Sequence, residues 1–112
     1  MKITDLLGEA TEYDKKQAVE HKKVKSWLKS VSAFANTAGG TLIFGITDGE
    51  EIVGLEDIKS DSEFISQKIK ERISPFPEVI MKLSKTEDEK DLLLLYVPAG
   101  AETPCYYTGD GV

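Results

Sequence analysis

The chain has 112 residues, 40% of them apolar and 30% charged, which allows one domain with a modest core and is not the composition of a disordered chain. Its single cysteine, Cys105, excludes an internal disulfide and a zinc site built on paired cysteines. The first residues lack the apolar centre of a signal peptide, and the longest apolar run, residues 92–98, is far too short to cross a bilayer. We therefore expect a cytoplasmic protein with no membrane partner.

The formal net charge is −6, but the charge is unevenly distributed. Residues 1–40 hold 7 lysines and 5 acids, a balance of +2, whereas residues 41–112 hold 7 basic and 15 acidic residues, a balance of −8. Six lysines accompany a single acid, Glu20, in one short stretch: Lys15, Lys16, Lys22, Lys23, Lys25 and Lys29. Such a local basic cluster is typical of a phosphate-binding surface. The alternative is that these lysines only solubilise the outer face of a helix.

The first half of the chain predicts a short helical turn at residues 3–7, a short strand within residues 11–16 and a longer helix over residues 22–38. In the longer helix, apolar side chains recur at spacings of three and four, which predicts one buried face. Trp27 falls on that face, so we expect it in the core rather than on a base-stacking surface. Lys22, Lys25 and Lys29 form a stripe of their own.

The helix leads into the stretch "SAFANTAGGTLIFGITDG", residues 32–49. Two interpretations of Gly39 and Gly40 compete: a phosphate-binding loop, or a helix end and a corner into a strand. A Walker loop places its glycines after a strand and before a helix and adds a lysine, whereas here the order is reversed and no lysine follows. The corner is therefore favoured, with Asn36 capping the helix end. Residues 41–47 then predict a central strand buried on both faces.

The second half predicts a hairpin at Asp48-Gly49 with a short return strand over residues 52–54. A capping-box pattern, Ser60 with Glu63, predicts the start of a second helix that Pro75 would end. Strands are expected over residues 79–83 and 92–97, joined by an acidic turn, with one more extended segment at residues 104–107. The order β-α-β-β-α-β-β predicts an α+β two-layer sandwich, in which two main helices pack on a mixed sheet.

Three carboxylates are candidates for catalysis or metal binding. If residues 9–14 run beside the central strand, Glu9 and Asp14 approach Asp48, which follows that strand. Three uncompensated carboxylates repel one another unless a divalent cation such as Mg²⁺ or Mn²⁺ binds them, and such a cation could activate water for phosphodiester cleavage. The simpler alternative is that Glu9 and the nearby Glu12 are solvated charges and Asp48 is a favoured turn residue.

Two further sites are less informative. His21 has no nucleophile or metal ligand in its sequence neighbourhood, so we expect a surface side chain. Tyr106 and Tyr107 could stack on bases or close the edge of the sheet, and the sequence leaves both interpretations open.

Three stretches of the chain resemble the Schlafen AlbA-like domain: residues 11–57, 63–79 and 93–111. The most specific part is "SAFANTAGGTLIFGITD". The resemblance implies a single domain over residues 1–112, the N-terminal DNA-binding module of a bacterial transcriptional regulator. A related domain in animal Schlafen proteins is an RNA endonuclease, and the acidic pattern of the family falls here on Glu9, Asp14 and Asp48.

The chain departs from the family pattern at three places. Lys15 stands where the family usually has an aromatic residue, and Cys105 where it commonly has a tyrosine. The family also continues into a strand carrying an arginine, so we expect a longer protein cut before its last strand.

Our main prediction is a domain that binds nucleic acid, DNA rather than RNA, with phosphate contacts from the six lysines. The alternatives are a Mg²⁺- or Mn²⁺-dependent ribonuclease and a module that forms a homodimer or docks a partner.

Overall fold

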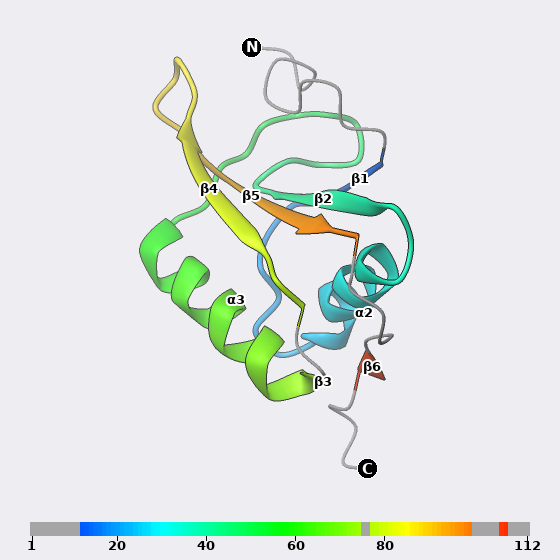
Figure 1. Cartoon of the computed structure of the whole chain (residues 1–112). Coiled ribbons are helices and arrows are strands. Elements are labelled where there is room, and N and C mark those ends of the chain that lie inside the picture. Colours follow the sequence, from blue (N-terminus) through cyan, green and yellow to red (C-terminus); the bar gives the residue numbers. More distant parts are fainter. Residues whose placement is uncertain (1–11, 75–76, 100–105, 108–112) are drawn as a thin grey trace.

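A computed structural model of the chain describes residues 12–74, 77–99 and 106–107 (Figure 1). Its main sheet has four strands in the order β1-β2-β5-β4, with bounds β1 Tyr13–Lys16, β2 Gly39–Phe44, β5 Asp91–Pro98 and β4 Ile80–Lys85. β1 and β2 are parallel, whereas β5 runs antiparallel to both β2 and β4. A parallel pair needs a crossover connection, and helix α2, Lys25–Ala35, supplies it.

The second helix, α3, spans Ile58–Arg72, and both helices lie on the same side of the main sheet (Figure 1). A small second sheet pairs β3, Ile73–Ser74, with β6, Tyr106–Tyr107, so the extended segment expected near the C-terminus is confirmed. The predicted α+β fold with two helices on a mixed sheet is also confirmed. The expected return strand over residues 52–54 is reduced to one bridge between Ile46 and Ile52. The predicted turn at residues 3–7 lies outside the described residues.

The core lies between the helices and one face of the sheet. Leu42 and Phe44 of β2 and Leu93, Leu95 and Val97 of β5 meet the apolar stripes of α2 and α3 there, and Trp27 is fully buried among them. Trp27 packs edge-on against Phe44 at 6.0 Å between ring centroids, so its predicted core position is confirmed. A smaller cluster, Ile43, Ile46, Leu92 and Leu94 with Ile52, is buried on the other face. Among the described residues, neither helix combines the length and the apolar character needed to span a membrane.

Both helices start at residues other than those predicted. α2 begins at Lys25 rather than residue 22. α3 begins at Ile58 because Asp57, not Ser60, is its N-cap: the Asp57 carboxylate accepts a hydrogen bond from the Ser60 backbone N–H at 3.1 Å. Aspartate and serine are comparable N-caps, so the local pattern alone does not choose between them. The capping-box prediction is therefore wrong by one turn.

Gly39 and Gly40 form the corner between α2 and β2. Asn36 is the C-cap of α2, and three residues later Gly39 adopts a positive φ of +91° as the first residue of β2. A Cβ at Gly40 would lie 2.4 Å from the ring of Phe34, so only glycine lets that ring pack against the strand. Both glycines are buried. A packed corner of this kind leaves no open cradle for phosphate.

Two turns at the same end of the sheet have the same construction. In one, Thr47 accepts a bond from Glu50 N–H through its carbonyl and one from Glu51 N–H through Oγ1. In the other, Thr86 accepts in the same way from Glu89 and Lys90. The fourth residue is left-handed in both, with φ of +65° at Glu50 and +61° at Glu89.

Candidate nucleic-acid interface

The interface begins where β1 meets α2. Lys16 Nζ lies 3.5 Å from Asp14 Oδ2 and donates to the carbonyl of Ser26 at 3.4 Å. Ser30 Oγ donates to the same Asp14 oxygen at 3.0 Å. Ser26 and Ser30 are one turn apart, so the side of α2 that carries them faces β1. These contacts fix the edge strand against the helix and place Lys16 beside its first turn.

Residues 17–24 connect β1 to α2 without regular secondary structure, yet the segment is anchored along its length. Val19 and Val24 are buried. The indole N–H of Trp27 donates to the Glu20 carbonyl at 3.0 Å, and because Trp27 is immobilised in the core, it fixes the main chain of the segment. The exposed lysines of this segment, Lys22 and Lys23, therefore start from a fixed backbone, which lowers the entropic cost of binding.

His21 has a partner that its sequence neighbourhood did not show. Its Nε2 lies 2.9 Å from Asp61 Oδ1 of α3. Its ring stacks on Phe64, with centroids 3.9 Å apart and planes inclined by 10°. The predicted surface position is correct, since 47% of the side chain is exposed, but the residue also ties the lysine-bearing segment to α3. A partner forty residues away leaves no local sequence signal.

The N-terminus of α2 concentrates positive charge. No acidic residue lies in its first turn and no side chain caps it, so the positive end of the helix dipole is not offset there. The exposed Lys25 and Lys29 each precede a β1-facing serine by one position and so point about 100° away from it. We call the resulting set the basic edge: Lys16, Lys22, Lys23, Lys25 and Lys29.

Lys15 is the sixth lysine of the predicted phosphate-binding cluster, but it does not lie on the basic edge. Successive strand residues face opposite sides of a sheet, so Lys15 lies on the face away from the helices. Its Nζ donates to the Asp48 carbonyl at 3.3 Å and lies 5.6 Å from the centroid of the Tyr13 ring.

The structure describes two of the three candidate catalytic carboxylates. Asp14 is on the helix side of β1, engaged by Ser30 and Lys16, and Asp48 is exposed in the turn after β2. Glu9 lies outside the described residues. Within residues 12–74, 77–99 and 106–107, no group of three histidine, cysteine or acidic side chains could hold a metal ion. The carboxylate site stays a prediction, which cleavage of structured RNA with Mn²⁺, compared with Asp48→Ala, would test.

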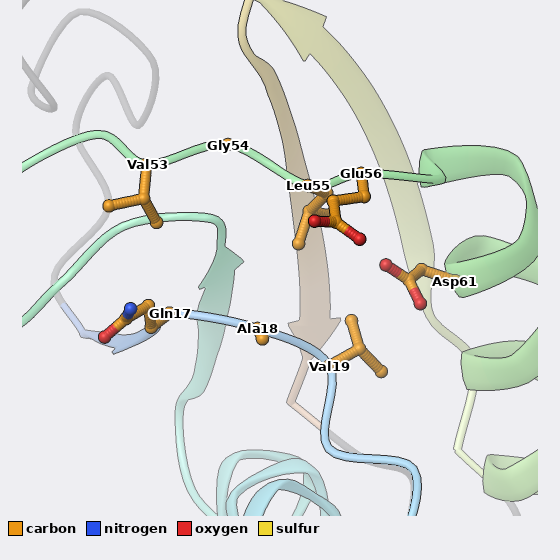
Figure 2. Close-up of a pocket in the computed structure, with 8 residues that line it drawn as sticks. All are labelled: Gln17, Ala18, Val19, Val53, Gly54, Leu55, Glu56 and Asp61. Atoms are coloured by element: carbon orange, nitrogen blue, oxygen red, sulfur yellow. The ribbon is translucent and has the colours of Figure 1, made fainter.

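A hollow of about 350 Å³ lies between the anchored segment and the residues that precede α3 (Figure 2). It is lined by Gln17, Ala18, Val19, Val53, Gly54, Leu55, Glu56 and Asp61. Figure 2 shows the carboxyl groups of Glu56 and Asp61 at the same end of the hollow. Two carboxylates disfavour an anionic ligand, so the hollow is not part of the candidate interface.

Comparisons with known proteins agree with this architecture. The family model for the Schlafen AlbA_2 domain matches residues 9–112. A search of curated proteins finds no match. The solution structure of the N-terminal domain of a RecG-related protein from Nitrosomonas europaea is similar with a TM-score of 0.69 and 24% identity, over 97% of this chain and 78% of that one.

A second similar structure is that of the DIP2311 protein from Corynebacterium diphtheriae, with a TM-score of 0.58 and 26% identity. The match covers 91% of this chain but 20% of that protein, so the domain corresponds to one part of a longer chain there. The structural likeness supports the fold, and the family model covers nearly the whole sequence. The chain belongs to the Schlafen AlbA_2 family.

Proposed function

We propose that this domain binds nucleic acid, DNA in particular, through the basic edge, as the DNA-binding module of a bacterial transcriptional regulator. Membership of the Schlafen AlbA_2 family supports an association with nucleic acid. The similar N-terminal domain from Nitrosomonas europaea belongs to a protein whose name relates it to a putative ATP-dependent DNA helicase. That name supports DNA as the ligand.

The observation that carries the proposal is the arrangement of the lysines on an anchored scaffold. The basic edge surrounds a helix N-terminus that has neither an acidic first turn nor a side-chain cap. Lysines beside the positive end of a helix dipole cost stability, and a bound phosphate would remove that cost. Phosphate contacts of this kind position the polymer without reading its sequence, so we expect weak sequence preference from this surface alone.

The test is the salt dependence of affinity for duplex DNA. Each phosphate contact contributes about 0.9 to the slope of log affinity against log salt concentration. Replacing Lys22, Lys23 and Lys29 together by alanine should weaken binding and reduce the slope by about 2 to 3.

The matched control replaces the exposed lysines Lys59, Lys70 and Lys85 instead, which changes the net charge equally but leaves the basic edge intact. This control should keep nearly the wild-type slope. An equal loss of affinity in both triple variants would show a response to net charge alone. An unchanged slope in the first variant would refute the proposed role of the basic edge.

A further inference from the structure

Three exposed side chains and one buried threonine form a row across the sheet on the face away from the helices. The strand register aligns Tyr13 of β1 with Thr41 of β2, Thr41 with Tyr96 of β5, and Tyr96 with Ile80 of β4. Leu95 and the other odd-numbered residues of β5 face the helices, so Tyr96 and the residues paired with it face the other way. We call Tyr13, Thr41, Tyr96 and Ile80 the aromatic row.

Three of the four side chains in the aromatic row are open to solvent, whereas Thr41, which lies between the two tyrosines, is buried with 4% exposure. Tyr13 is 40% exposed, Tyr96 43% and Ile80 55%, although aromatic and branched apolar side chains are normally buried. The smaller core cluster, with Ile52 packed on it, occupies the neighbouring part of the same face. That cluster leaves Tyr13, Tyr96 and Ile80 exposed. Exposed aromatic and apolar side chains grouped on one face of a sheet indicate a binding surface.

Among the paired strand residues beside the aromatic row, the charged side chains are positive. Two residues along each strand, the next aligned row on this face consists of Lys15, Ile43, Leu94 and Lys82. It has a lysine on each edge strand and apolar residues between them. Within the paired residues of the four strands, these two lysines are the charged residues of this face, and the acids Asp14 and Asp91 alternate to the other side. Two aromatic rings with two lysines in the adjacent row fit an anionic ligand that has flat apolar parts.

We infer that Tyr13 and Tyr96 of the aromatic row stack on the bases of single-stranded nucleic acid while Lys15 and Lys82 hold its phosphates; this adds a second surface to the proposed nucleic-acid binding and rests on that proposal. A duplex presents no free base faces, whereas unpaired bases stack readily on tyrosine rings. Neighbouring strands are about 4.8 Å apart, and β2 lies between β1 and β5, so the backbones at Tyr13 and Tyr96 are separated by about 10 Å. Each ring can therefore stack on a different base. Lys15 lies on this face rather than with the basic edge, which gives its separate position a role.

The test compares three ligands of equal length: an oligothymidylate, the same strand without bases, and a duplex. In the wild-type protein the oligothymidylate should bind more tightly than the abasic strand. Tyr96→Ala should weaken oligothymidylate binding about fivefold or more and leave abasic binding unchanged, because stacking needs the base. Tyr96→Phe should keep wild-type affinity. Leu83→Ala is the matched control, since Leu83 is 52% exposed on β4 but alternates to the opposite face.

Tyr13→Ala provides a second variant should Tyr96→Ala fail to fold, and the same pattern is expected from it. Equal losses for the base-containing and abasic strands, or no loss for either, would overturn the inference. If the basic-edge triple variant loses affinity while the tyrosine variants do not, the inference fails and the proposed function stands. If the wild-type protein binds no nucleic acid at low salt, both fail. A dimer that Tyr96→Ala converts to monomer with unchanged binding would assign the face to contact between copies and refute the inference.

Discussion

Replacing Glu89 by glycine should stabilise the domain, because Glu89 holds a left-handed conformation with φ of +61°. A side chain in this region costs roughly 1–2 kcal/mol relative to glycine. Glycine loses more freedom on folding, which offsets roughly 0.5–1 kcal/mol of that gain. The net gain should be about 0.5–1 kcal/mol, or about 2–5 °C in Tm for a domain of this size. The two hydrogen bonds that Thr86 accepts in this turn come from the main-chain N–H groups of residues 89 and 90, so they survive the change.

The assay is thermal unfolding followed by circular dichroism, with Glu87→Gly as the matched control. Glu87 lies in the same turn and has the same charge, but it does not have a positive φ, so glycine there should lower the Tm. Glu50→Gly in the equivalent turn should raise the Tm by a similar amount, since its φ is +65°. If Glu89→Gly lowers the Tm as much as Glu87→Gly does, the conformational argument is refuted.

Two further predictions concern single side chains. Trp27→Phe removes the donor to the part-buried Glu20 carbonyl and should reduce the free energy of unfolding by about 2 kcal/mol in urea denaturation; an unchanged value would show that this bond does not anchor the segment. The hydrogen bond from Gln67, followed by that from Lys68, lowers the pKa of Glu71. The carboxylate therefore stabilises the fold at neutral pH, and this contribution is lost as the pH falls through the folded-state pKa. The Tm difference between wild type and Glu71→Gln should be small at neutral pH and disappear in strong acid; a constant difference would contradict the assignment.

The elements that the sequence predicts best are those in which burial is periodic. The three- and four-residue spacing around Trp27 predicted α2 and its buried face, and the apolar run after Gly40 predicted a strand buried on both sides. The start of α3 was misplaced because Asp57 and Ser60 are both good caps. The choice depends on tertiary contacts of the preceding segment, such as the bond from Leu55 N–H to the Asp91 carbonyl.

The candidate interface was only partly predictable. The cluster of lysines is a local feature of the sequence, so most of the basic edge could be named from it. The separation of Lys15 from Lys16 follows from the alternation of β1, whose four residues are too few to show a periodic pattern. The aromatic row joins Tyr13 to Tyr96 through two strand registers, one parallel and one antiparallel, and no local pattern encodes such a pairing.

The position of β1 at the end of the described sheet has a consequence for solubility. An end strand presents unpaired backbone groups to which a strand of another molecule can add, and lysine side chains on such a strand oppose that addition. Lys15 and Lys16 occupy half of β1, and Lys82 and Lys85 are placed on β4 at the other end. Three of these lysines, Lys15, Lys16 and Lys82, are also proposed phosphate contacts, so the same side chains would oppose pairing of this sheet with the sheet of another copy. Variants that remove several of them at once should be checked for aggregation before a loss of binding is interpreted.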